Sequence, residues 1–422
     1  MNAARFALIA AFAALAAGAR AAEILTLDEA VAAGRENHPR ASAARAAADG
    51  ARARALQAYS AYYPQISIAA DWTRSRAFYP ILGAGAAKET EVGSASLQLR
   101  QTLYDFGRTS GAAKAARLNR AAAEQAHAAA RQDAALRVKE AYYLVLAAEK
   151  QVVAERETAA AREEVFRQAR GYFDEGVRSK LDVSRAEAGL HAANTALIRA
   201  ENNRDLARVE LASSMGRPDT EPRPLAEPTA PLPELPDRAE ARRRALADNA
   251  DIRRLDSQRD AAQAGARAAR SDYLPVLSGA ASAGRADGSF PPGGSVWSAG
   301  IGLSVPLFSG FSTREKAREA DAALRAVSAE REDMELIVGK EVDAAWLAVR
   351  EASARMDSTG KQEQSARESR TLASARYREG VGIIIEIADA QASAIDAETA
   401  RIQAAYDARI ARARLERALG KE

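Results

Sequence analysis

The sequence has no cysteine, only three histidines and few aromatic residues. Without cysteine, the chain can form no disulfide, no thiolate metal site and no lipidated N-terminal cysteine. The histidines, His38, His127 and His191, are scattered, so we expect no metal site and no cofactor. Aromatic residues make up 5% of the 422 residues, which is too few for large globular cores. An all-β fold and an alternating strand-helix enzyme are therefore not expected. The lone Ser, His and Asp residues form no recognisable catalytic triad, so we expect no enzyme.

Long hydrophobic runs and an excess of charge of one sign are also lacking. The 60 Lys and Arg residues nearly balance the 57 Asp and Glu residues, so nothing indicates nucleic-acid binding. Beyond the N-terminus no run of about 18 apolar residues exists, which argues against a membrane-spanning helix. The strands of a membrane β-barrel carry only a weak alternating pattern and remain compatible with this sequence.

Residues 1–21 are predicted to be a secretory signal peptide. A short basic segment, Met1–Arg5, precedes an apolar run over Phe6–Ala17 that is too short to span a bilayer. Ala19-Arg20-Ala21 then fits a small-residue cleavage site. A buried core helix is the alternative interpretation of the same run.

About a quarter of the chain is alanine, and the chain matches itself at a fixed shift. Residues 138–145 resemble residues 342–349, 204 positions later, and Glu175-Gly176-Val177 matches Glu379-Gly380-Val381 at the same shift. We therefore predict an internal duplication, with a first repeat over 22–216, a proline-rich linker over 217–237 and a second repeat over 238–422.

Each repeat contains two stretches with a period of two, which is typical of strands with one apolar and one polar face. Gln65–Thr73 and Ser94–Leu103 alternate in the first repeat, and Val276–Gly284 and Val296–Leu307 in the second. Loops are expected between them, over Phe78–Val92 and Asp287–Ser295. The sequence thus predicts β-hairpins over about 65–105 and 276–308.

A long helical hairpin is predicted after each β-hairpin, over about 109–214 and 313–419. The first helix of each has no proline, ends near a glycine-containing turn, and is followed by a second helix that runs back. Four strands per chain cannot close a barrel, for which about eight are needed. Three chains would supply twelve strands, so we expect a mixed fold: a trimeric membrane β-barrel continued by a long α-helical barrel.

This plan resembles the TolC-like outer membrane factors. The resemblance rests on the duplicated hairpin-and-helix order, on the Glu-Gly-Val turns, and on Tyr104-Asp105-Phe106-Gly107-Arg108 and Leu307-Phe308-Ser309-Gly310 at the strand-to-helix transitions. It covers essentially the whole chain after the signal peptide. It implies an outer-membrane homotrimer, in contact with outer membrane lipid and extending into the periplasm. It also implies a role in efflux or type I secretion, with a periplasmic adaptor and an inner-membrane transporter of RND or ABC type as partners. A soluble periplasmic coiled-coil scaffold or adaptor is the alternative.

Candidate functional residues gather at the two helix-helix turns. Glycines allow the reversal there, and the turns, at Gly176, Val177, Gly380, Val381 and Gly382, are candidate adaptor contacts or simply turns. Glu386 and Asp389, three residues apart, share a helix face and would form an acidic ring in a trimer. The alternative is an ordinary solvated face.

The resemblance adds a closed-state contact between the turns. In the family, a Tyr and an Arg of the second turn bond to neighbouring groups that include an Asp of the first. Tyr377 and Asp182 match this pattern, but Gly382 stands where the family has Arg, so Arg178 of the first turn is the candidate replacement. On the strands, Trp72 and Trp297 are candidate membrane-interface anchors, with ordinary packing as the alternative.

Overall fold

The structure is a computed structural model that describes residues 24–81, 84–218, 223–289 and 291–421. The predicted signal peptide lies outside these residues. The chain divides into two units. The helical unit contains the residues up to Ala44, Ala128–Asn249 and Leu336–Glu422, and the strand-bearing unit contains Arg45–His127 and Ala250–Glu335. Among the described residues, no helix is both long and apolar enough to cross a membrane.

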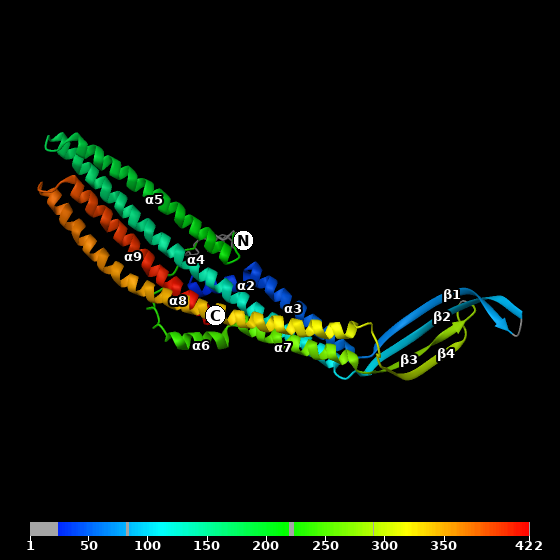
Figure 1. Cartoon of the computed structure of the whole chain (residues 1–422). Helices are drawn as coiled ribbons and strands as arrows, with labels where there is room; N and C mark the ends of the chain where they lie inside the picture. The colour runs from blue at the N-terminus through cyan, green and yellow to red at the C-terminus, as the bar shows by residue number, and fades with distance from the viewer. Residues whose placement is uncertain (1–23, 82–83, 219–222, 290, 422) are drawn as a thin grey trace, which may run out of the picture. The chain divides into compact units, whose positions relative to one another are not determined.

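Four long helices lie side by side in the helical unit, in the order α5, α4, α9, α8 (Figure 1). Ion pairs connect each neighbouring pair: Arg208–Glu149 at 2.7 Å joins α5 to α4, and Arg414–Glu140 at 2.6 Å joins α9 to α4. Arg401 and Glu363, 2.7 Å apart, join α9 to α8. The helices are α4 (Arg108–Asp174), α5 (Lys180–Ser214), α8 (Ser312–Arg378) and α9 (Ile384–Ala418), and all begin and end within one residue of the expected ranges.

Small side chains allow these helices to pack closely. On α5, Ala186, Ala193 and Ala200 are buried at intervals of seven residues, which is the spacing of a left-handed coiled-coil seam. The opposite face of α5 carries exposed apolar side chains, among them Leu206 and Val209. The α5 helix therefore has one partnered and one unpartnered face within the chain.

Two short helices and the linker pack against the long helices of the helical unit. These helices are α2 (Leu27–Asn37) and α6 (Arg238–Asp248). Leu25, just before α2, forms an isolated parallel bridge with Leu225 of the linker. The buried Tyr142 hydroxyl lies 2.9 Å from the Leu25 carbonyl oxygen and 2.7 Å from the Ala226 carbonyl oxygen. Its single proton is donated to one of these two oxygens at a time. Burial raises the pKa of Tyr142 to about 12, so the phenol remains a neutral donor.

The strand-bearing unit contains one antiparallel sheet in the order β1-β2-β3-β4. The helices α3 (Pro39–Tyr59) and α7 (Ala250–Arg270) lead, each through a short 3₁₀ turn, into β1 and β3. β1 and β4 each have a single neighbour, so both edges of the sheet lack a strand partner. The strands are β1 (Gln65–Ile81), β2 (Ala84–Tyr104), β3 (Val276–Asp287) and β4 (Ser295–Ser304).

The expected loop over Phe78–Val92 was wrong, because the first hairpin continues through it. Pairing of β1 with β2 extends from Gln65↔Arg100 to Ile81↔Ala84. An ion pair between Arg74 and Glu89, with nitrogen and oxygen 3.1 Å apart, crosses the two strands in this extension. The turn residues within Phe78–Val92, such as Pro80 and Gly85, predicted a loop, but both lie in the paired strands, and cross-strand pairing of opposite charges stabilises the extension.

The apolar and polar faces of the sheet follow the alternation in the sequence. One row across the four strands contains Ile68, Leu97, Ala283 and Trp297, which are paired in register. The adjacent row contains Ser67, Gln98, Ser282 and Ser298, and the last two hydroxyls are 2.9 Å apart. Ile68, at 80% exposure, and Trp297, at 78%, show that the apolar face is uncovered in the single chain.

A sharp corner follows β2 where the strand gives way to α4. Phe106 and Gly107 both have positive φ, at 52° and 101°. Asp105 stabilises the corner, because its carboxylate accepts from the Thr109 backbone N–H at 2.8 Å and from the Thr109 hydroxyl. The segment singled out in the sequence thus forms a helix cap.

Candidate functional site

The two helix-helix turns share one backbone geometry. Gly176 has φ of 74° and Gly380 has φ of 75°, the left-handed conformation that glycine favours. In the first turn the Val177 N–H donates to the Tyr172 carbonyl at 2.8 Å, and the second turn repeats this with Val381 and Arg376 at 3.1 Å. These are Schellman-type helix ends, so each glycine ends a long helix and reverses the chain.

Arg178 of the first turn reaches across to the second. Its Nη2 donates to the Gly382 carbonyl at 3.0 Å, and its guanidinium lies 5.4 Å from the centre of the Tyr377 ring. Tyr377 is 1% exposed and packs edge-to-face on Tyr172, with ring centres 6.2 Å apart. The structure therefore brings Arg178, Tyr377 and Gly382 together in a contact between the two turns, which we call the tip clasp.

The tip clasp also depends on the absence of a side chain at Gly382. A Cβ added there would lie 3.0 Å from both the Arg376 carbonyl carbon and the Tyr377 nitrogen. Any larger residue at this position would need the neighbouring backbone to shift. An arginine side chain at position 382 would thus require a backbone shift, whereas Arg178 of the first turn bonds to the Gly382 carbonyl without one.

Burial raises the pKa of Tyr377, an effect that Arg178 opposes and Asp182 reinforces. The Tyr377 hydroxyl is buried and has no hydrogen-bond partner among the described residues. The structure does not place Asp182 on this hydroxyl, since the carboxylate of Asp182 accepts from the Ser179 hydroxyl at 3.3 Å. Of the residues expected in the closed-state contact, Arg178 and Tyr377 meet directly and Asp182 lies beside them.

The two candidate gate acids are exposed on α9 and differ in their surroundings. Glu386 forms an ion pair with Arg376, at 3.4 Å between nitrogen and oxygen, and both side chains are exposed. Asp389 instead lines a pocket of about 250 Å³ between the two helical hairpins. Ile384, Ile387 and Ala390 of the same helix are buried, so the acids lie away from the packed face.

Arg162 is a residue at this pocket that sequence reasoning missed. It lines the pocket together with Arg185, and its Nη2 donates to the Ala388 carbonyl at 3.3 Å. Burial lowers the pKa of Arg162. Nothing in the sequence separates Arg162 from the other arginines of α4, because its role depends on α9, which is distant in sequence. Arg376 was likewise not predicted, because its contact with Glu386 joins two different helices.

The candidate interface anchors lie on the sheet as the alternation predicts. Trp72 pairs with Gly93, and Trp297 pairs with Ala283. Their exposures are 59% and 78%. Both indoles thus lie opposite small residues and are exposed on the surface of the sheet.

Solved structures share this fold. The outer-membrane channel OprN superposes with a TM-score of 0.84, at 24% identity over 94% of this chain and 90% of that one. The outer membrane protein VceC from Vibrio cholerae gives a TM-score of 0.82, at 20% identity over 94% of this chain and 96% of that one. Long helical hairpins joined to a four-stranded sheet therefore define the class: the fold of outer-membrane channel subunits.

Sequence comparison narrows the class to a family. Residues 30–217 and 241–421 match the outer membrane efflux protein family, so the chain belongs to that family. The outer membrane efflux protein BepC of Brucella suis biovar 1 is 27% identical over 374 residues, covering 86% of this chain and 78% of BepC. Protein CyaE of Bordetella pertussis is 29% identical over 353 residues, covering 80% of this chain and 71% of CyaE. The expected resemblance to TolC-like factors is confirmed, and with it the location in the bacterial outer membrane and periplasm.

Proposed function

We propose that the chain is one subunit of a homotrimeric channel-tunnel that conducts substrates passively from the periplasm across the outer membrane. It would receive them from a periplasmic adaptor and an inner-membrane transporter of RND or ABC type, in efflux or type I secretion. The main support is the sheet, which leaves two strand edges unpaired and one apolar face exposed. Unpaired edges and exposed apolar faces are unfavourable in an isolated chain in water. Closure with two further copies would pair the edges, and the lipid of the outer membrane would cover the apolar face.

We further propose that the chain arose by internal duplication. The helices α4 and α8 both have 67 residues, and α5 and α9 both have 35. Their first residues, Arg108 and Ser312, and Lys180 and Ile384, are each separated by the 204 positions found in the sequence. The tip clasp itself joins two positions that are 204 apart.

The decisive test of the channel is reconstitution of the purified protein in planar bilayers after cell fractionation. We expect recovery with the outer membrane and discrete conductance steps. Recovery only in the soluble periplasmic fraction would support the scaffold alternative instead. Size measurement in mild detergent reports separately on whether three copies associate.

We expect Glu386 and Asp389 to set ion selectivity at the tip entrance. The doubly substituted Glu386→Ala, Asp389→Ala channel should lose much of its preference for cations, because like charges around a narrow aqueous opening attract cations. A carboxylate about 5 Å from a passing ion contributes roughly 0.8 kcal/mol even in bulk-water dielectric, or a factor of about four in relative permeability. Reversal potentials in a salt gradient measure this change.

Single substitutions sharpen the gate experiment. Arg376 pairs with Glu386, and Arg162 and Arg185 line the same pocket as Asp389, so each single alanine variant should change the selectivity less than the double variant. Arg376→Ala should increase the cation preference. Identical reversal potentials for wild type and the double variant would remove both acids from the gate.

We expect the tip clasp to hold the entrance closed. Arg178→Ala removes a charged hydrogen bond and a cation–π contact, together roughly 1–2 kcal/mol at a partly exposed site, which corresponds to a shift of about 5- to 30-fold toward open states. The resting conductance in planar bilayers should rise accordingly. Arg178→Lys keeps the charge but not the planar fork and should have an intermediate effect.

Two matched variants test whether charge alone explains the result. Lys180→Ala removes a cation from an exposed position two residues later and should leave the resting conductance unchanged. Asp182→Ala should have a smaller effect than Arg178→Ala, because the Asp182 carboxylate accepts from the Ser179 hydroxyl within the same turn. A resting conductance that neither Arg178→Ala nor Asp182→Ala alters would contradict the clasp.

A further inference from the structure

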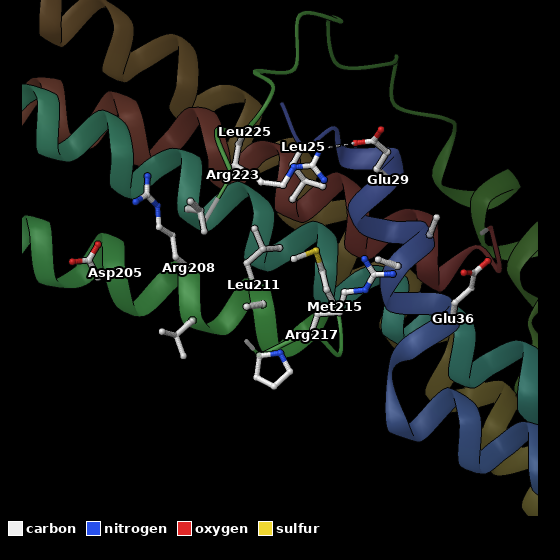
Figure 2. A pocket seen from close by; sticks show the side chains of 16 residues that line it. Leu25, Glu29, Glu36, Asp205, Arg208, Leu211, Met215, Arg217, Arg223 and Leu225 are labelled. Atoms are coloured by element: carbon white, nitrogen blue, oxygen red, sulfur yellow. Dashed lines mark ion pairs between the residues drawn. The ribbon is translucent and has the colours of Figure 1, made fainter. Parts of the chain in front are cut away.

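A pocket of about 570 Å³ lies at one edge of the helical unit, between α2, α4, α5 and the linker. Figure 2 shows Leu211 and Met215 projecting into it from α5, with Leu25 and Leu225 at its upper side. An ion pair between Arg223 and Glu29, 3.9 Å between nitrogen and oxygen, spans the rim. The pocket is thus apolar inside and charged at its rim.

We propose that Leu336 of a second copy of the chain inserts into this pocket, carried there on the α8 helix of that copy. The proposal deepens the proposed trimer and rests on it, because it assigns a specific contact to the junction between copies. In one chain α5 and α8 lie at opposite ends of the row of four helices (Figure 1). A contact between them therefore requires a neighbouring copy.

A contact already present within the chain provides the template. The helices α4 and α9 are joined by ion pairs between Arg417 and Asp133 at 2.7 Å and between Lys139 and Glu416 at 3.1 Å. Moving 204 positions along the sequence converts α4 into α8, and moving 204 positions back converts α9 into α5. The packing of α4 on α9 thus predicts how α8 of one copy would pack on α5 of the next.

Burial supports this correspondence, because matched positions are buried in one repeat and exposed in the other. The α4 side chains that face α9 recur every 11 residues and are 5–8% exposed: Gln132, Tyr143, Ala154 and Val165. Their counterparts on α8 are all exposed: Leu336, Leu347, Ser358 and Ser369.

The other side of the contact shows the same contrast. Ile410 and Ala413 of α9 are 8% and 5% exposed, whereas Leu206 and Val209, their counterparts on α5, are 59% and 67% exposed. Both exposed faces therefore lack the partner that their counterparts have. Val209 also lines the pocket, which connects this face to it.

The template places Leu336 at the pocket itself. Gln132, its counterpart, is buried and donates through Nε2 to the Gly420 carbonyl at 3.0 Å. The counterpart of Gly420 is Gly216, whose neighbours Met215 and Arg217 both line the pocket. Leu336 is 68% exposed in the single chain. Replacement of a glutamine by a leucine at this position matches the apolar interior that Leu211 and Met215 provide.

Thiol cross-linking tests this contact directly, because the natural chain contains no cysteine. We would prepare the full-length variant Leu336→Cys, Arg217→Cys and treat isolated outer membranes with a short bismaleimide. Covalent dimers and trimers are expected on a denaturing gel. Each single-cysteine variant should remain monomeric on the same gel.

Two cysteine pairs serve as controls. The pair Asp133→Cys, Arg417→Cys should link within one chain without changing the oligomer mass. In the pair Leu336→Cys, Ile198→Cys, the second residue is also exposed on α5 but lies about 27 Å from Gly216 along the helix, so no linked species is expected. The cysteines at positions 336, 217 and 198 leave both ion pairs that join α4 to α9 intact.

The outcomes separate this proposal from the trimer itself. Size measurement of the uncross-linked protein in mild detergent first establishes whether copies associate. If they do, and the Leu336–Arg217 pair gives no linked species or the Leu336–Ile198 pair gives them instead, the pocket assignment is wrong while the trimer stands. If the wild-type protein is a monomer in the outer membrane, both fail.

Discussion

The Gly216→Ala substitution should lower the free energy of opening the helical unit by about 2–5 kcal/mol. Gly216 has φ of 70°, which costs an alanine about 1–2 kcal/mol. A Cβ there would also lie 2.6 Å from the Asn37 carbonyl oxygen and 2.8 Å from its carbon. Because both atoms belong to the backbone at the end of α2, only a shift of that helix can relieve the overlap. Hydrogen–deuterium exchange of the α2 amides measures the loss.

Two other glycines separate the contributions to this effect. Gly176 has a similar φ of 74° but nothing within 4 Å of its added Cβ, so Gly176→Ala should show the backbone cost alone. Gly171, inside α4, also has open space, and Gly171→Ala should stabilise its helix by roughly 0.5–1 kcal/mol. Equal losses for Gly216→Ala and Gly176→Ala would mean that the approach of Asn37 contributes nothing.

Gly420, 204 positions after Gly216, offers an independent repetition of the same experiment. Gly420 has φ of 74°, and its added Cβ would lie 2.9 Å from the Asp248 carbonyl oxygen at the end of α6. The end of α2 thus lies against Gly216, and the end of α6 lies against Gly420. Gly420→Ala should therefore expose the α6 amides as Gly216→Ala exposes those of α2.

The helices were predictable from the sequence because their signals are local. The long proline-free segments and the Glu-Gly-Val turns set the ends of α4 and α8 to within one residue. The alternation in β2 and β4 likewise identified the faces of the sheet, because side-chain direction alternates strictly along a strand. The part of the first hairpin over Phe78–Val92 was missed, because its turn residues predicted a loop, whereas Pro80 and Gly85 pair with each other near the end of the hairpin.

The candidate site was predictable only in part. The glycines of the turns were identified because a helix reversal requires positive φ there. The bond from Arg178 to Gly382 depends on two segments 204 residues apart, and neither segment alone indicates it. The ion pair between Arg376 and Glu386 and the contact of Arg162 with Ala388 arise in the same way, from packing between helices distant in sequence.

In the proposed barrel the apolar face of the sheet contacts lipid. Substitutions at two neighbouring residues, Gln98 and Leu99, test this contact. Leu99 and Gln98 are adjacent on β2 and therefore project from opposite faces. Leu99 pairs with Ile66 and Ala281 on the apolar face, whereas Gln98 pairs with Ser67 and Ser282 on the polar face. A substitution to arginine at each position places the same side chain on the two faces.

Leu99→Arg should destabilise the folded protein by roughly 2–4 kcal/mol if Leu99 lies near the bilayer midplane, because the charge would enter hydrocarbon. Gln98→Arg should be close to neutral, since Arg100 already occupies the same face two residues later. Urea titration in lipid vesicles, together with the yield of folded protein in outer membranes, measures both. Equal stability of the two variants would show that this face meets water, and a larger loss for Gln98→Arg would show that the faces are reversed.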